Sequence, residues 1–402
     1  MLNIPNFISQ TITKRNQSLF LPDIKSNTDE LLKAVSGKRI LVIGGAGTIG
    51  SSFIKAVLPF KPSQLFVVDI SENGLTELTR DLRSTYKMFV PEDYKTYPLN
   101  YSDPIFEKMY IDNKGFDIVA NFSAHKHVRS EKDKWSIQAL IENNLIRAKH
   151  LLDVMLSFPP ERYFCVSTDK AANPVNIMGA SKRIMEDLIM SYSVHFNVTT
   201  ARFANVAFSN GSLLAGFVER IMKRQPLSSP IDVKRYFVSP EESGQICMLS
   251  CFLGNNREIF FPKLNEEQMM TFSHIGDCFL HSLGYQVKYC QTEEEAKCFA
   301  ASMSDESDTY PVYYFKSNTT GEKMFEEFYV EGEHVDMSRF QTLGVIDSVS
   351  ENTFNGVSGL LDKLKQLFED SSFTKQQVVD IIGEYLPNFV HEEKGKNLDQ
   401  VM

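Results

Sequence analysis

The segment from residue 39 to residue 69 constrains the fold of this chain more than any other. An apolar run, Arg39–Ile43, leads into the glycine-rich turn Gly44-Gly45-Ala46-Gly47-Thr48-Ile49-Gly50. A helical pattern follows to about Leu58, and a second apolar run covers Leu65–Asp69. A strand, a glycine turn, a helix and a further strand in this order are typical of the first unit of a parallel sheet.

The alternation of helices and strands continues to about residue 206. We expect helices at 71–83, 136–157 and 179–192, and strands at 117–122, 163–167 and 199–206. Strands that alternate with helices predict a parallel sheet covered on both faces. The predicted fold class is therefore α/β, a Rossmann-type doubly wound parallel sheet with a smaller mixed region and a helical tail.

The glycine turn predicts a dinucleotide site. Its glycines allow a tight turn and a close approach of the backbone to a pyrophosphate, and the helix start offers free N–H groups. The acid that ends the next strand can bind the ribose hydroxyls and would repel a 2′-phosphate, so we predict NAD. The candidate cofactor contacts here are Gly44, Gly47, Thr48, Ile49, Gly50 and Asp69. The alternative is a purely structural turn with a solvated Asp69.

The regular alternation begins near residue 37 and stops near residue 210, which predicts four regions. They are an N-terminal extension (1–36) with a helix at Thr28–Val35, an NAD-binding Rossmann domain (37–210), a mainly substrate-binding region (211–345) and a helical C-terminal tail (346–402). Apolar residues at helical spacing place two amphipathic helices in the tail, Val357–Phe368 and Lys375–Tyr385.

The composition limits the kinds of partner that this chain can bind. The chain has 42 basic and 51 acidic residues and a formal net charge of −9, which argues against broad binding to nucleic acid or anionic membranes. We see no membrane-spanning apolar run and no basic-then-apolar leader. Six cysteines without a C-x-x-C pair indicate reduced thiols and a cytoplasmic protein. His125 and His127 lack a third ligand nearby, so no metal is predicted.

A second informative segment is Ser167–Lys182. Met178 stands four residues before Lys182, where the Tyr-x-x-x-Lys pair of a short-chain dehydrogenase has its tyrosine. A lysine lowers the pKa of that tyrosine and makes it a base, whereas a thioether carries no proton. Asp169 and Lys170 supply a carboxyl and an amine side by side. The segment predicts a dehydrogenase-like site in which a different acid/base pair transfers the protons. The alternative is that Asp169 and Lys170 form a surface ion pair at a strand end.

Further short motifs accompany this segment. They are Ser123-Ala124-His125-Lys126-His127-Val128, Asn144, Arg202-Phe203-Ala204-Asn205-Val206, Ser209-Asn210-Gly211-Ser212 and Lys234-Arg235-Tyr236-Phe237-Val238. Over residues 38–345 the chain resembles the UDP-N-acetylglucosamine 4,6-dehydratases of the extended short-chain dehydrogenase/reductase superfamily, in particular members with methionine at the tyrosine position. The segments 311–329 and 395–399 resemble the branch associated with legionaminic-acid-type sugar pathways.

The resemblance implies a reaction and a role for each residue of the segment. Sugar C4 gives a hydride to NAD, the resulting ketone acidifies the C5 proton, the C6 hydroxyl leaves as water, and the hydride returns to C6. Lys170 would be the C5 base, so it must be neutral, and Asp169 would be the acid for the C6 oxygen, so it must hold a proton. Thr168, Asp169 or a water relay would take the 4-hydroxyl proton. Met178 would pack beside the nicotinamide and the sugar.

The resemblance also assigns binding residues. Ser123, Ala124, Asn144 and Lys182 would lie on the cofactor side, with Lys182 at the nicotinamide ribose. The candidates for the nucleotide-sugar are Lys126, Asn205, Ser212, Arg235 and Lys323. The alternative for Lys126 and Lys323 is that they are ordinary surface lysines. The alternative for Asn144 is a role in packing.

Several alternatives stay open at this point. The alternative enzymes are a C5-inverting dehydratase and a sugar 4-epimerase, and a non-catalytic dinucleotide sensor is a third hypothesis. The adjacent Asp169 and Lys170 favour a dehydratase, because a simple epimerase needs no such couple. The carrier is UDP or GDP, on N-acetylglucosamine. The superfamily implies a homodimer or larger homo-oligomer through helices at 136–156 and 179–195.

Overall fold

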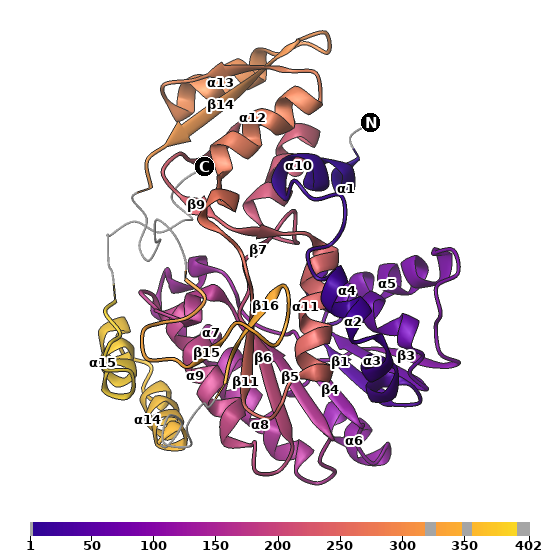
Figure 1. The fold of residues 1–402 in the computed structure, drawn as a ribbon. Helices are drawn as coiled ribbons and strands as arrows, with labels where there is room; N and C mark the ends of the chain where they lie inside the picture. The colour runs from indigo at the N-terminus through magenta and orange to yellow at the C-terminus, as the bar shows by residue number, and fades with distance from the viewer. Residues whose placement is uncertain (1–2, 318–326, 348–355, 392–402) are drawn as a thin grey trace.

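The computed structural model describes residues 3–317, 327–347 and 356–391. Figure 1 shows two lobes, a larger one built around a central sheet and a smaller one above it. Each lobe has its own cluster of buried apolar side chains. The N-terminal residues join both clusters, because Phe7 and Ile12 are buried in the small lobe and Phe20 and Leu31 in the large one.

The central sheet confirms the predicted doubly wound α/β fold. In the described part of the chain it has nine strands in the order β15-β16-β11-β6-β5-β4-β1-β2-β3, and the seven from β11 to β3 are parallel. The strands are β1 (Arg39–Ile43), β2 (Gln64–Asp69), β3 (Asp93–Pro98), β4 (Ile118–Asn121), β5 (Arg162–Val166), β6 (Asn197–Ala201), β11 (Glu258–Pro262), β15 (Val335–Asp336) and β16 (Leu343–Ile346). The short hairpin of β15 and β16 closes one edge in antiparallel pairing.

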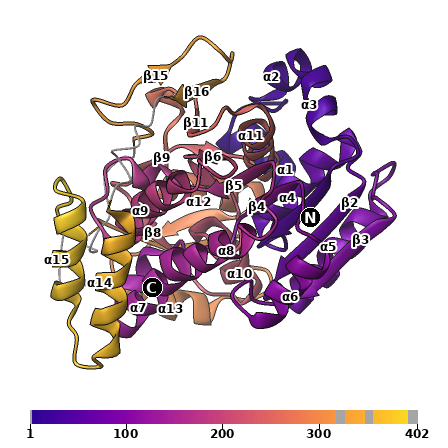
Figure 2. The same cartoon turned by 90° about the horizontal axis from the view of Figure 1, so that it is seen from below.

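Helices cover both faces of this sheet (Figure 2). On one face α4 packs against α11 and α11 against α3, whereas α9 packs against α7 and α8 on the other. The helices of the large lobe are α2 (Leu21–Ser26), α3 (Thr28–Val35), α4 (Thr48–Val57), α5 (Glu72–Ser84), α6 (Pro104–Asp112), α7 (Lys134–Ile141), α8 (Arg147–Met155), α9 (Ile177–Ser191) and α11 (Pro240–Leu253). A π-helical stretch, Glu142–Ile146, interrupts the single helix that the sequence predicted between α7 and α8.

Two sequence predictions need correction. The single strand expected at 199–206 is two, because β6 ends at Ala201 and Asn205–Val206 forms β7, which pairs with β10 (Phe237–Val238). The sequence prediction also lacks β3 and α6. Strand β3 lies at the sheet edge and is half-exposed, so its residues carry charges where a buried strand would be apolar.

The small lobe holds a second, three-stranded parallel sheet of β13 (Gln286–Tyr289), β14 (Thr309–Phe315) and β8 (Leu227–Pro230). Helices α1 (Ile4–Phe7), α10 (Leu213–Met222), α12 (Phe272–Ser282) and α13 (Glu293–Ser302) belong to it. A two-stranded ribbon of β9 (Lys234–Arg235) and β12 (Met270–Thr271) lies alongside. The region 211–345 thus contributes to both lobes, since α11, β11 and β16 return to the large sheet.

The two helices predicted in the tail are present, as α14 (Val357–Glu369) and α15 (Lys375–Tyr385). They form a hairpin that lies beside α9 in both ribbon views (Figures 1 and 2). The hairpin buries Val357, Leu360, Leu361, Leu364, Val378 and Ile382 in the core of the large lobe. None of the helices in the described ranges is long and apolar enough to cross a membrane.

Candidate active site

The predicted site residues gather at one edge of the central sheet. The glycine turn follows β1, Asp69 ends β2, Ser123 comes shortly after β4, and Thr168 comes shortly after β5. These strands are parallel neighbours, so their carboxyl ends meet at the same edge. The chain turns in opposite directions from β1 and β4, and such a switch point is where open α/β sheets bind ligands.

The turn after β1 can be built only from glycine at two positions. Gly44 has a φ of +73°, and a Cβ on it would lie 2.7 Å from the Ser123 nitrogen. A Cβ on Gly50 would lie 2.4 Å from the Gly44 carbonyl oxygen. Gly47 precedes α4, and no side chain caps the N–H groups of that helix. A close-packed glycine turn with uncapped N–H groups fits the pyrophosphate of a dinucleotide.

Asp69 and Thr48 hydrogen-bond to backbone groups in and around this turn. The Asp69 carboxylate accepts hydrogen bonds from the Ala46 and Ser71 backbone nitrogens, at 3.0 and 2.9 Å. The Thr48 hydroxyl accepts one from the Asn210 nitrogen at 2.9 Å, at the point where the chain enters the small lobe. Ile49 packs against the core in the first turn of α4. These residues could hold an NAD-type cofactor, and the contact of Asp69 with its ribose stays a prediction.

We call Ser167–Lys182 the chemistry segment. It begins shortly after β5 with a short 3₁₀ turn, Asp169–Ala171. The Thr168 hydroxyl donates to Asp169 Oδ1 at 2.8 Å, and Lys170 Nζ lies 3.0 Å from the same oxygen. The Asp169 side chain is only 3% exposed and that of Lys170 is 21% exposed. A carboxylate this deeply buried is not the solvated surface pair of the alternative reading. Thr168 and Lys170 thus meet at one oxygen of the Asp169 carboxylate.

Helix α9 brings Met178 and Lys182 to the same strand end. Met178 is buried in its first turn. Lys182 is also buried, and its ammonium group donates to the Val166 carbonyl oxygen at 3.0 Å. Burial lowers the pKa of Lys182, and the nearby Cys165 and Glu186 offset part of that effect. Lys182 therefore ties α9 to the end of β5.

Asn144 connects the loop after β4 to α9. It lies in the π-helical stretch, accepts a hydrogen bond from the His125 nitrogen at 2.8 Å and donates to the His125 carbonyl oxygen at 2.9 Å. Its amide also donates to the Ser181 hydroxyl at 3.1 Å. The Ser123 hydroxyl donates to Asn121 at 2.7 Å. The loop that carries Ser123 and Ala124 is thus held at both ends.

Two side chains on this loop have a lowered pKa. The Lys126 ammonium donates to the Asn210 carbonyl oxygen at 3.0 Å. Partial burial of its ammonium group lowers the pKa of Lys126, although the residue as a whole is exposed. Burial and the charge of Arg147 lower the pKa of His125. Within the described ranges no three His, Cys, Asp or Glu side chains are grouped to hold a metal ion.

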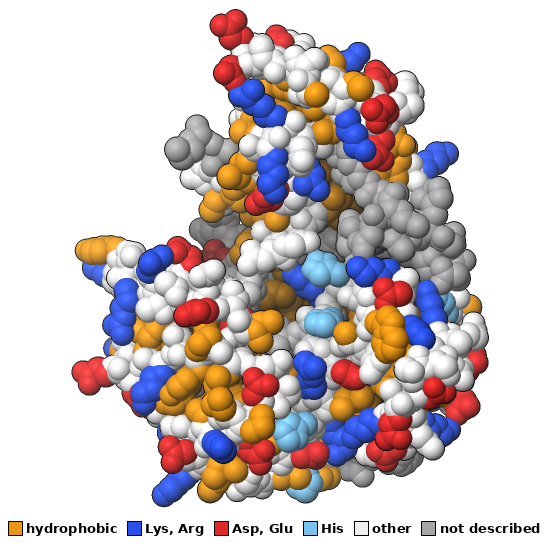
Figure 3. Space-filling view, turned by 180° about the vertical axis from the view of Figure 1, so that it is seen from behind, with side chains coloured by type: hydrophobic (Ala, Val, Ile, Leu, Met, Phe, Trp, Pro, Cys, Tyr) orange, Lys and Arg blue, Asp and Glu red, His pale blue; other side chains and the backbone are white. Residues whose placement is uncertain are grey.

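The substrate-binding candidates lie toward the small lobe. Asn205 is in β7, Ser212 caps α10 by accepting from the Ala215 nitrogen at 3.2 Å, and Arg235 is buried in β9. Figure 3 shows a hollow between the lobes, with histidine and basic side chains at its edge. Their common contact with one ligand stays a prediction. Lys323 lies outside the described residues.

The sequence prediction missed a buried charge network behind the chemistry segment. Glu186 of α9 accepts hydrogen bonds from the Ser167 hydroxyl at 2.6 Å and from Arg202 at 2.9 and 2.7 Å. Arg202 also donates to Glu333 at 3.0 and 2.9 Å. The motif around Arg202 was visible in the sequence, but its two partners are distant along the chain. The network joins α9, β5 and the loop at 327–335.

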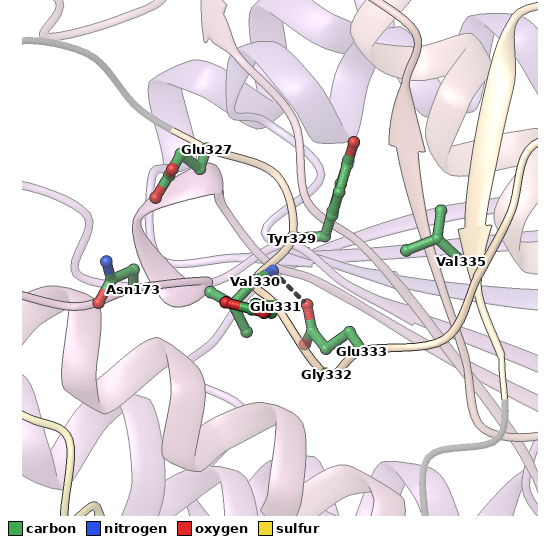
Figure 4. A pocket seen from close by; sticks show the side chains of 8 residues that line it. All are labelled: Asn173, Glu327, Tyr329, Val330, Glu331, Gly332, Glu333 and Val335. Carbon is green, nitrogen blue, oxygen red and sulfur yellow. Dashed lines mark hydrogen bonds between the residues drawn. The ribbon is translucent and has the colours of Figure 1, made fainter.

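That loop lines a pocket of about 600 Å³ (Figure 4). The lining residues are Asn173, Glu327, Tyr329, Val330, Glu331, Gly332, Glu333 and Val335. Asn173 belongs to the segment that carries Asp169, so the pocket adjoins the chemistry segment. Its three glutamates do not suit a diphosphate, so this pocket is not a candidate site for the nucleotide.

Asp187, next to Glu186, carries a prediction about stability. The side chain is 2% exposed, and its Oδ1 has no hydrogen-bond partner among the described residues, although Arg183 lies 3.3 Å away. Burial raises the pKa of Asp187 to about 6. Because the pKa is higher in the folded state, Asp187 stabilises the fold at pH values below its unfolded-state pKa near 4. This stabilisation is lost as the pH rises through about 6. Asp187→Asn should therefore stabilise the fold by about 1–3 kcal/mol at pH 7.5 and by little at pH 4.5.

Urea unfolding at the two pH values measures this difference. Asp380→Asn, the same change on the exposed side of α15, serves as the control and should shift neither value. A stability difference for Asp187→Asn that is equal at both pH values would contradict a raised pKa.

The geometry defines the class of protein. A doubly wound sheet with a dinucleotide-type glycine turn after β1 and a Thr-Asp-Lys segment after β5, two strands away, is the arrangement of an extended short-chain dehydrogenase/reductase. The chain belongs to the polysaccharide biosynthesis protein family, whose sequence model matches residues 40–347.

Two relatives and one solved structure are similar to this chain. An uncharacterized membrane protein of Methanocaldococcus jannaschii is 28% identical over 77% of this chain and 85% of its own length. The UDP-N-acetylglucosamine 4,6-dehydratase (inverting) of Campylobacter jejuni is 22% identical over 87% of this chain and 98% of its own. The structure of DesIV, a dTDP-glucose 4,6-dehydratase from Streptomyces venezuelae with NAD and TYD bound, has a TM-score of 0.55 and 18% identity, covering 84% of this chain and 99% of that one. The resemblance predicted from the sequence is confirmed at the level of the superfamily.

Proposed function

We propose that this protein is an NAD-dependent nucleotide-sugar 4,6-dehydratase that converts UDP-N-acetylglucosamine, or its GDP analogue, to the 4-keto-6-deoxy sugar. The observation that carries the proposal is the buried Asp169, bonded to Thr168 and Lys170 at the end of β5. The dehydratase names of the Campylobacter relative and the Streptomyces structure support it. NAD is the cofactor that the glycine turn and Asp69 fit, and it is bound in the Streptomyces structure.

The residues present supply the proton transfers of such a reaction. The Thr168 hydroxyl, which donates to Asp169, offers a path for the 4-hydroxyl proton to reach that carboxylate. Lys170 then removes the C5 proton, and Asp169 gives its proton to the departing C6 oxygen, so that one water leaves. Lys170 finally returns a proton to C5. When bound, NAD would take the hydride from C4 and return it to C6.

The setting of the reaction is also part of the proposal. The family description as a polysaccharide biosynthesis protein supports a role in bacterial surface glycan or nonulosonic acid biosynthesis. The nucleotide-sugar would be the partner of the enzyme, which would work in the cytoplasm. A negatively charged chain needs local cations for a diphosphate, and Lys126 and Arg235 are the candidates.

Internal hydride return gives the first test of function. UDP-N-acetylglucosamine deuterated at C4 should lose one water and yield a product with deuterium at C6, without net conversion of NAD. Mass spectrometry measures the loss of water, and NMR locates the label and reports the configuration at C5.

Each alternative predicts a different readout. An epimerase would return the label to C4 without loss of water, and a dinucleotide sensor would bind NAD and leave the sugar unchanged. Label that appears in free NADH or in solvent would rule out the mechanism proposed here.

A further inference from the structure

The outward side of helix α9, which carries Met178 and Lys182, is covered by the same chain. Within residues 177–191 only Arg183 and Ser191 are not buried. A helix on the face of an open sheet normally keeps a polar stripe in water. Here α7, α8 and β6 pack on α9, and α14 of the C-terminal hairpin packs on it as well. Figure 2 shows α14 and α15 side by side next to α9.

Apolar contacts dock the hairpin. The buried side chains of α14 and α15, among them Leu364 and Ile382, belong to the same core cluster as those of α9. The turn of the hairpin is held too, because Phe373 packs edge-on against Trp135 with ring centroids 5.9 Å apart. The Lys134 ammonium donates to the Ser371 carbonyl oxygen at 2.7 Å. The hairpin therefore spans from the start of α7 to α9.

Polar contacts connect the hairpin to the first turn of α9. After α15, His391 Nε2 lies 3.3 Å from Glu131 Oε2, and the other oxygen of Glu131 accepts the Met178 N–H at 2.8 Å. The His391 and Glu131 side chains are 8% and 3% exposed, so water competes little with these contacts. Tyr385 adds a hydrogen bond to Asp187 at 3.2 Å, in the third turn of α9.

We propose that the C-terminal hairpin, meaning α14, α15 and the residues up to His391, is the intramolecular partner of α9 and positions its first turn. It occupies the face that a second subunit would need in a dimer built on α7, α8 and α9. The chain is therefore monomeric with respect to that face. His391 and Glu131 are positioning residues for Met178, and only their effect on turnover rests on the proposed function.

Amide exchange on the full-length protein with NAD tests the proposal without any substrate. Leu364→Asp puts a charge into the docked face, and His391→Ala removes only the contact with Glu131. Both variants should raise exchange in residues 177–182 by about tenfold, the effect of losing a charge-assisted hydrogen bond. Lys363→Ala breaks an exposed ion pair with Glu384 on the same hairpin and should leave that exchange unchanged.

Sedimentation and turnover complete the test. Wild-type exchange in α9 should be independent of protein concentration, and any species above the chain mass of 45.8 kDa should associate through another face. His391→Ala should lower kcat about tenfold at unchanged KM, and His391→Gln, which still donates to Glu131, should regain part of it. Where wild type turns over no nucleotide-sugar, the proposed function fails and amide exchange alone decides this proposal.

Two results would overturn the proposal. One is a His391→Ala variant in which amide exchange of residues 177–182 equals that of wild type. This result also decides the case if Leu364→Asp fails to fold. The other is a wild-type dimer in which the α9 amides become protected as protein concentration rises.

Discussion

Asp169→Asn and Lys170→Ala should each lower kcat for the nucleotide-sugar by about 10²–10⁴-fold, the range for loss of a general acid or base. Asparagine keeps the shape of Asp169 and the hydrogen bond from Thr168, but it carries no proton to the C6 oxygen. Alanine removes the amine that would take the C5 proton. The affinity for NAD and for the nucleotide should change little, because neither residue is assigned to them. Steady-state kinetics and equilibrium binding measure the two effects separately.

A second pair of Asp and Lys side chains in contact provides a matched control. Asp93 and Lys95 are also 3.0 Å apart, but their side chains are 40% and 52% exposed at the sheet edge. Asp93→Asn and Lys95→Ala should keep turnover near that of wild type. If the Asp169 and Lys170 variants behaved in the same way, that pair would have a structural role only.

Local sequence patterns predicted the elements that position this site. Strand β1 and helices α3 and α15 have the predicted bounds. Strand β2 differs by one residue at its start, and β4 and β5 differ by one residue at each end. Buried parallel strands read as continuous apolar runs, and amphipathic helices repeat their apolar residues every three or four positions. The glycine turn was visible for a similar reason, because only glycine fits at Gly44 and Gly50.

Elements that depend on distant contacts could not be predicted in this way. The run from Thr199 to Val206 looks like one strand, but Arg202 leaves the sheet hydrogen-bonded to Glu186 and Glu333. Strands β11 and β16 return to the large sheet from a region without regular alternation. Local periodicity contains no information on which sheet a strand joins.

The same limit applies to the candidate site. The motif showed that Asp169 and Lys170 are adjacent, but burial of the carboxylate is a property of the folded chain. Glu131 contacts both the Met178 backbone and His391, which lies 260 residues further along the chain. A single glutamate or histidine in a sequence gives no signal of such a contact.

The largest loss of stability is expected from Arg202→Leu, about 3–5 kcal/mol of unfolding free energy. Arg202 is completely buried and bonds both oxygens of Glu186 and of Glu333. Burial alone would raise the pKa of Glu186, but Arg202 and Arg183 hold it below its ordinary value. Leucine fills part of the space and leaves the Glu186 carboxylate charged without its main partner. Chemical denaturation measures the loss, and Arg80→Leu on the exposed surface of α5 should cost less than about 1 kcal/mol.

A double variant shows whether the loss comes from charge or from packing. Glu186→Gln combined with Arg202→Leu removes the unpaired buried carboxylate, while the amide can still accept the hydrogen bond from Ser167. Replacing both members of a buried pair is much less harmful than removing one, so the double variant should be more stable than Arg202→Leu alone. Additive losses in the two substitutions would mean that Arg202 acts through volume. In that case Arg202→Lys, which keeps the charge but not the planar fork, should be as unstable as Arg202→Leu.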